Sequence, residues 1–263
     1  FLDERLTGLT SRTPVIDLGL QPRWKSARHF DDTYPIGPND STEEKTYLLH
    51  AWLAADATDV DAVIEWYLLD TILLGHEAAP LRKAIIDSGI GVDMISSGAF
   101  PLGREIAFAI GIKDSEANRQ TCFSELITST LNDIADRGIT AEDVSTALQQ
   151  ATYHYQEIQP MYPLHTLDRV LDAWIYGMDP LTFLRLGEHL EGCRQRYRDD
   201  PKLFERLIRK RILSNTHQLS ICLRPDPEMQ TRTDTAFSER MRALRASLTD
   251  ADTQRIAKEA AAL

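Results

Sequence analysis

The sequence has few cysteines and no long apolar run, and both absences narrow the class of protein. Only three cysteines occur in 263 residues, at positions 122, 193 and 222, too few and too widely spaced for a disulfide framework or a Cys-x-x-Cys metal site. We therefore expect a reducing compartment, either the cytoplasm or the matrix of an organelle. The longest candidate membrane span, residues 60–74, is broken by Glu65 and Asp70. It falls short of the ~20 residues that cross a bilayer, so no membrane partner is expected.

The amino terminus also lacks features that mark the start of many proteins. The chain begins at Phe1 rather than Met, and no charged segment with a following apolar core marks a signal peptide. Residues 1–9 have the pattern of a helix end whose beginning is missing. We therefore expect a piece of a longer polypeptide, with any targeting signal outside it.

No complete catalytic signature occurs in the sequence. A zinc hydrolase needs two histidines one helical turn apart and a glutamate that deprotonates the bound water. His76 begins an H-E-x-x-H pattern, but Pro80 stands in place of the second histidine. His154 begins the inverted H-x-x-E-H pattern, and there Ile158 replaces the second histidine. We predict no catalytic residue, no metal ligand and no cofactor in this chain. Nucleophile-elbow and phosphate-loop motifs are absent as well.

Acidic residues outnumber basic residues, and the excess lies in the first part of the chain. Residues 1–160 hold 12 Lys and Arg against 25 Asp and Glu, whereas residues 161–263 hold 17 against 15. This balance disfavours nucleic acid as a partner and favours basic or neutral partners. An acidic surface that only keeps the protein in solution explains the same numbers. The one basic cluster, within residues 206–211, lies opposite an apolar helix face and indicates a solvated surface.

Pairs of strands alternate with pairs of helices over residues 1–158. The periodicity predicts strands over residues 28–35, 46–54, 90–95 and 104–112, and helices over residues 58–75, 80–89, 115–136 and 140–158. This order favours an α+β fold, with an antiparallel sheet packed with helices, over a doubly wound sheet. Residues 159–263 are expected to form a mostly α-helical linker region with one short strand over residues 217–223. We therefore predict two parts, residues 1–158 and residues 159–263.

Four collinear segments carry a family resemblance. Residues 73–91, LLGHEAAPLRKAIIDSGIG, contain a helix end at a glycine corner and an A-P-L-x-K-A opening of the next helix. The other three are FAIGI at residues 108–112, DPL at residues 179–181 and LSICLRPD at residues 219–226. Together they resemble the pitrilysin/insulinase superfamily of zinc metallopeptidases, most closely its presequence-protease branch. The similarity extends from about residue 20 to about residue 255.

The resemblance implies a parent enzyme whose two halves close on a peptide. Each half would hold two similar α+β domains, and the first domain of the enzyme would bind zinc. This chain resembles the second domain and the helical region that joins the halves. The zinc ligands and the catalytic glutamate are therefore expected outside it. The implied partners are the remaining domains of the same polypeptide and short unstructured peptide substrates, and the implied roles are chamber wall, exosite and hinge.

The resemblance also implies an exosite, a second place where substrate contacts the enzyme. The matching positions follow the corner at residues 89–91, and they are Ile95, Ser96, Ser97, Gly98 and Ala99. Small side chains at a sheet edge let another backbone approach and add as a strand. An ordinary hairpin turn explains the same residues equally well.

Two functions of other classes stay open. A free-standing non-catalytic interaction module would show the same elements and the same missing zinc site. A complete enzyme with an active site of an unrecognised kind is the third reading. An H-x-x-E-H motif encoded upstream of Phe1 would favour the peptidase fragment over both.

Overall fold

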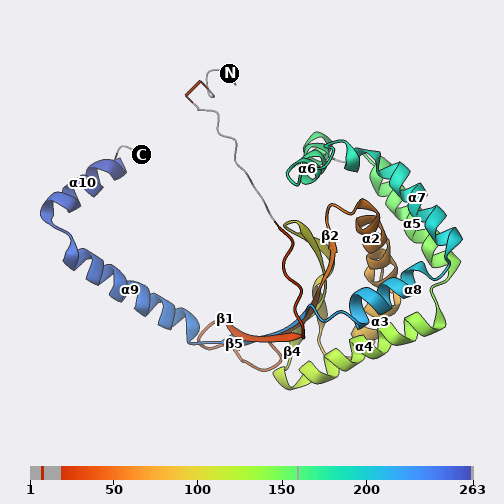
Figure 1. Cartoon of the computed structure of the whole chain (residues 1–263). Coiled ribbons are helices and arrows are strands. Elements are labelled where there is room, and N and C mark those ends of the chain that lie inside the picture. The colour runs from red at the N-terminus through yellow and green to blue at the C-terminus, as the bar shows by residue number, and fades with distance from the viewer. Residues whose placement is uncertain (1–6, 9–18, 159, 262–263) are drawn as a thin grey trace.

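A five-stranded sheet forms the centre of the fold, in the order β1-β5-β2-β4-β3 (Figure 1). The computed structural model describes residues 7–8, 19–158 and 160–261. Most of the helix end predicted over residues 1–9 therefore lies outside the described residues. The strands are β1 (Arg28–Pro35), β2 (Thr46–Asp56), β3 (Asp93–Leu102), β4 (Glu105–Ser115) and β5 (Gln218–Asp226).

Neighbouring strands of the sheet run antiparallel except at one edge, where β1 and β5 are parallel. Strand β5 lies between β1 and β2, so the later part of the chain supplies a central strand to the sheet. It corresponds to the short strand predicted over residues 217–223, but it begins one residue later and continues to Asp226. The predicted fold class, an α+β sheet packed with helices and followed by a mostly helical region, is confirmed.

The helices α2, α3, α4 and α8 lie on one side of the sheet (Figure 1). Large side chains that the sequence places at helical or strand spacing are buried between these layers, among them Trp66, Phe108, Phe123 and Phe204. The helices that precede β5 are α2 (Val60–Leu74), α3 (Pro80–Asp87), α4 (Gln120–Arg137), α5 (Ala141–Gln156), α6 (Tyr162–Trp174), α7 (Leu186–Asp199) and α8 (Leu203–Ile208). Three short helical segments, η1 (Ala117–Arg119), η2 (Thr182–Arg185) and η3 (Arg209–Leu213), lie among them.

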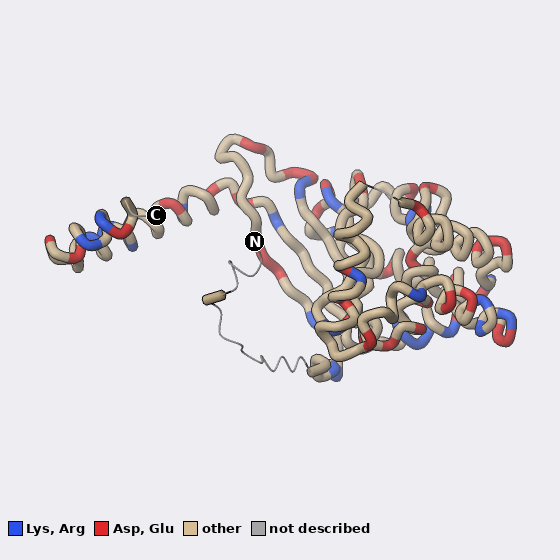
Figure 2. The backbone as a smooth tube through the Cα atoms, turned by 90° about the horizontal axis from the view of Figure 1, so that it is seen from above, with Lys and Arg blue, Asp and Glu red and all other residues tan. Residues whose placement is uncertain are grey.

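The last two helices, α9 (Met229–Ser247) and α10 (Asp250–Ala261), extend away from the body of the molecule (Figure 1). Neither buries a residue, and large apolar side chains such as Phe237, Leu244 and Ile256 are exposed on them. Both helices carry acidic as well as basic residues (Figure 2). Within the described residues, no helix has the length and apolarity that crossing a membrane requires.

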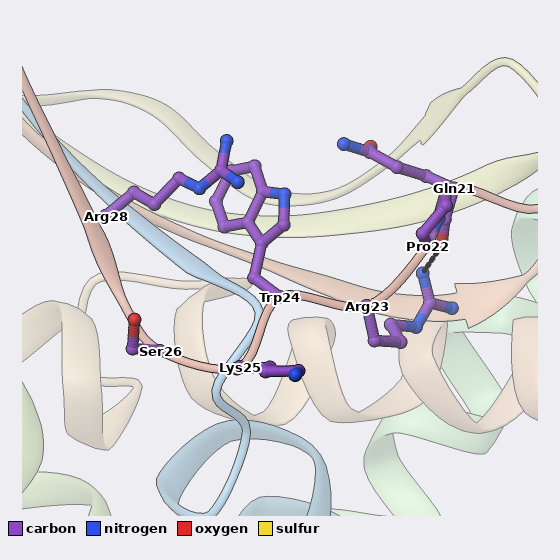
Figure 3. A pocket seen from close by; sticks show the side chains of 7 residues that line it. All are labelled: Gln21, Pro22, Arg23, Trp24, Lys25, Ser26 and Arg28. Carbon is purple, nitrogen blue, oxygen red and sulfur yellow. Dashed lines mark hydrogen bonds between the residues drawn. The ribbon is translucent and has the colours of Figure 1, made fainter.

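A strap at residues 21–28 fastens the beginning of the chain to the sheet (Figure 3). The Trp24 ring stacks on the His217 ring with centroids 4.0 Å apart, and the backbone N–H of Trp24 donates to His217 Nδ1 at 3.2 Å. Burial, and next the nearby Arg23, lower the pKa of His217, which keeps Nδ1 free to accept. Arg23 pairs with Glu105, and the Arg28 guanidinium lies 4.2 Å from the Trp24 ring centroid. The cations at Arg23 and Arg28 therefore hold the strap in place.

The hairpin of β3 and β4 departs from the expectation. The sequence predicted strands at residues 90–95 and 104–112 with an irregular connection, whereas β3 continues to Leu102 and pairs there with Glu105. Only two residues form the turn, and Gly103 has the positive φ, +64°, that such a turn needs. The added length of β3 contains Gly98 and Pro101, two residue types that interrupt most strands. A bulged edge strand accommodates both, because it tolerates a missing N–H.

A half-buried histidine, His50, couples the sheet to α4. The His50 Nε2 on β2 lies 2.7 Å from the Ser124 Oγ of α4, and the ring lies against Phe123 and Trp52. Burial, and next the nearby His29, lower the pKa of His50 to about 4. The folded protein therefore holds this imidazole neutral at pH values where an unfolded chain protonates it.

We predict that the free energy of unfolding falls by about 2 to 3 kcal/mol as the pH is lowered from 7 to 4 through His50 alone. The unfolded histidine takes up a proton near pH 6.5, and the folded one only near pH 4. The stability is therefore present above pH 6.5 and is lost as the pH falls. Urea unfolding of wild type and His50→Gln at several pH values measures this, and an equal pH dependence in both proteins contradicts the assignment.

Candidate functional site

The five residues of the predicted exosite lie in β3, the strand at one end of the sheet order. They span an irregularity in the pairing with β4, because the register shifts between Ile95 and Gly98. Ser96 and Ser97 are exposed, whereas Gly98 is buried and Ala99 is half-buried. The structure thus places the segment at a bulged sheet edge.

The bulge is held by a serine side chain. The Gly111 N–H of β4 donates to Ser97 Oγ at 3.0 Å, and the Ser97 hydroxyl donates to the carbonyl of Ile95 at 2.8 Å. Ser96 has a φ of +43°, a conformation that is uncommon outside glycine. The Ser97 hydroxyl therefore takes a place in the ladder that a backbone group fills in a regular pair.

Helix α2 contacts this edge through one carboxylate. The Ala99 N–H donates to Asp70 Oδ2 at 3.1 Å. A Cβ at Gly98 would lie 2.8 Å from the same Asp70 oxygen, and Gly98 has a φ of +116°. Burial raises the pKa of Asp70, an effect that the hydrogen bond from Ala99 opposes. Residue 98 must therefore be glycine for this contact to form.

The outer edge of β3 offers fewer free donors than strand addition needs. The Ala99 N–H is bound to Asp70, and the Met94 N–H donates to the Asp93 side chain at 2.8 Å. Pro101 has no N–H to give. The segment has side chains small enough for a second backbone to approach, but at Ala99 that backbone must replace Asp70. Such blocking of an exposed edge is a common protection against unwanted pairing.

The two zinc-like patterns do not come together into a metal site. His76 lies in the connection between α2 and α3, and His154 lies near the end of α5 with its Nδ1 3.9 Å from Glu157 Oε2. His154 and His165 line one surface cavity together with Asp168. Among residues 7–8, 19–158 and 160–261, no three His, Cys, Asp or Glu side chains are grouped to hold a metal ion. These residues do not fit a catalytic zinc.

The fold and the site define an α+β domain with a protected sheet edge and, as far as the structure describes the chain, without a set of zinc ligands. Residues 22–151 match the family model of the peptidase M16 inactive domain. The chain belongs to the M16, or pitrilysin-like, peptidase family, and its resemblance to presequence proteases is confirmed.

Relatives of known sequence and structure extend this finding. Presequence protease 1, chloroplastic/mitochondrial, from Arabidopsis thaliana is 30% identical over 234 residues, which are 86% of this chain and 22% of that protein. The mitochondrial presequence protease of Mus musculus is 24% identical over 240 residues, 90% of this chain and 23% of that protein. The chain thus spans about a fifth of the length of these relatives.

A solved structure supports the fold. The crystal structure of a protease from Helicobacter pylori superposes with a TM-score of 0.61 at 12% identity, over 85% of this chain and 50% of that chain. At this identity the likeness supports the shared fold and no shared activity.

Sequence reasoning missed Asp70, the side chain that most constrains the candidate site. Its position on α2 falls between apolar residues, where an acidic residue marks the solvent side of an amphipathic helix. Only the packing of α2 against β3 brings Asp70 to Ala99, 29 residues further along the chain. The signals available in the sequence were Gly98 and the acid inside an apolar run.

We predict that Gly98→Ala lowers the free energy of unfolding by about 1 to 3 kcal/mol, because it combines a positive φ with a clash against Asp70. The matched control is Gly187→Ala in α7, where the nearest atom lies 3.9 Å from the added Cβ. The control should be neutral or slightly stabilising. Urea denaturation of the three proteins measures both changes. Equal stability of the two variants would argue against the strained contact.

We predict that the purified chain binds no stoichiometric zinc and cleaves no peptide, because Pro80 and Ile158 stand where the second histidines would be. Metal analysis after dialysis, together with a peptidase assay, measures this. Stoichiometric zinc that disappears in His154→Ala would overturn the prediction.

Proposed function

We propose that this chain is a non-catalytic, substrate-contacting part of a zinc-dependent metalloendopeptidase that degrades short unstructured peptides. The observation that carries the proposal is a bulged edge strand with small side chains inside an M16 inactive domain. The relatives named presequence protease support the substrate class. Zinc would be bound by residues outside this chain.

The proposed roles are chamber wall, exosite and hinge. Helices cover one side of the sheet (Figure 1), which leaves the other side for a chamber wall. The arm formed by α9 and α10 buries nothing within the described residues and exposes apolar side chains, as expected of a segment that joins other parts of a polypeptide. The remaining domains of the same polypeptide are thus the proposed partners.

The proposed division into residues 1–158 and residues 159–263 follows the same roles. The first part would be the pitrilysin-like α+β domain and the second the associated linker region. Because β5 completes the sheet from the second part, the two would move together up to Asp226. The hinge would then lie at α9 and α10.

A reducing compartment, the cytoplasm or an organelle matrix, is the proposed location. All three cysteines are free thiols, and Cys193 and Cys222 are buried. Burial raises the pKa of the Cys193 thiol to about 11, which keeps it protonated.

At the exosite, the backbone of an extended peptide would add to β3 between Ile95 and Ala99. A peptide carbonyl would accept the Ala99 N–H in place of Asp70 Oδ2. Because burial raises the pKa of Asp70, release of its carboxylate to solvent favours the ionised form and offsets part of the lost hydrogen bond.

We predict that Ser97→Pro in the parent enzyme lowers kcat/KM about tenfold or more for long peptides and leaves short peptides unaffected. Proline removes one donor and fixes φ at the proposed edge, whereas a short peptide does not reach from the zinc to β3.

The control is Ser97→Ala, which removes the Ser97 Oγ contact with Gly111 but keeps the backbone N–H. It should affect long peptides less than Ser97→Pro does. A parallel loss on short and long peptides would indicate misfolding, and no loss on either would remove the exosite from the proposal.

A further inference from the structure

An apolar cavity of about 470 Å³ lies directly beside the proposed exosite. Its walls include residues of β3, α2 and η2, which are distant in sequence. Strand β3 contributes Ala99 to Pro101, helix α2 contributes Val63, Trp66 and Tyr67, and the turn η2 contributes Phe183. The volume lies in the range of sites that bind small ligands or side chains.

The polar groups around the cavity suit an uncharged guest. Arg169 and Asp172 supply one charge of each sign, so the lining does not select a charged side chain. Trp66 is only 1% exposed, and no protein group among the described residues accepts a hydrogen bond from its indole Nε1–H. A buried donor of this kind is costly unless an acceptor reaches it.

The cavity and the outer edge of β3 lie close enough together for one peptide to contact both. Residues along an added strand point alternately to its two sides, so every second side chain of a peptide on β3 faces the same way. Because Ala99 and Pro101 belong both to the edge strand and to the cavity wall, a side chain of such a peptide lies next to the opening.

We propose that this cavity receives one aromatic or branched aliphatic side chain of an extended peptide that lies along β3. This proposal rests on the proposed exosite and adds a sequence preference to it. The enzyme's longer substrates would then be chosen partly by an apolar residue at a fixed distance from the cleaved bond.

The test uses the full 263-residue chain and two nine-residue peptides with blocked ends. Both peptides consist of alternating Gly and Ser, with either Phe or Ala at the central position. The Phe peptide should bind at least about tenfold more tightly by calorimetry, since burial of a phenyl ring contributes more than this factor requires.

Two variants of the wall test the cavity itself. Val63→Phe fills it and should abolish the preference for the Phe peptide. The matched control is Val92→Phe, the same change at a residue that is 70% exposed, which should keep the preference. If Val63→Phe does not fold, Phe183→Ala is the alternative, because Phe183 is half-buried and forms part of the cavity wall. This variant should weaken binding of the Phe peptide more than binding of the Ala peptide.

Ser97→Pro separates the cavity from the exosite. If it weakens both peptides and the Phe preference remains, both proposals are supported. If Val63→Phe abolishes the preference for the Phe peptide but Ser97→Pro leaves the affinity for both peptides unchanged, the cavity is supported and the exosite is contradicted. Equal binding of the two peptides, weakened by Ser97→Pro, supports the exosite and overturns the cavity. No binding of either peptide at millimolar concentration overturns both.

Discussion

The hydrogen bond between the Ala99 N–H and the Asp70 carboxylate ties the edge of the sheet to the helix that covers it. Gly98 is required because any Cβ there would meet the same carboxylate, and the pairing of β3 with β4 shifts register across Ser96 and Ser97. The cavity beside Ala99 exists because α2 and β3 are held at this spacing. The contact also blocks a sheet edge that is otherwise open to pairing.

If the proposed exosite is correct, this contact would make the edge of β3 a surface that opens only when a peptide displaces Asp70. A peptide that added to β3 would have to compete with this internal acceptor, so a poorly matched peptide would gain little binding free energy. In the proposal, a peptide that also filled the apolar cavity would gain the additional burial needed to displace Asp70. Selectivity would thus arise from two adjacent weak sites, far from the zinc that the proposed parent enzyme carries elsewhere.

The order of strands and helices was predictable because each element has a clear period or cap, such as the alternation around Phe108 and Pro80 at a first helical turn. The bounds of β3 were not predictable, because Gly98 and Pro101 interrupt the local strand pattern. Only a bulged edge strand accommodates both residues. The parallel pairing of β1 with β5 joins residues almost 200 positions apart, as in the pair of Arg28 with Leu219. Nothing local in the sequence encodes that pairing or the approach of Asp70 to Ala99.

Hydrogen exchange at the Ala99 amide tests the central constraint most directly. The account predicts slow exchange in the wild-type chain and markedly faster exchange in Asp70→Ala, while the amides of β4 keep their rates because their partners are unchanged. Asp70→Asn should exchange at nearly the wild-type rate, since its side-chain carbonyl still accepts. An Ala99 rate that is the same in wild type and Asp70→Ala would contradict the account.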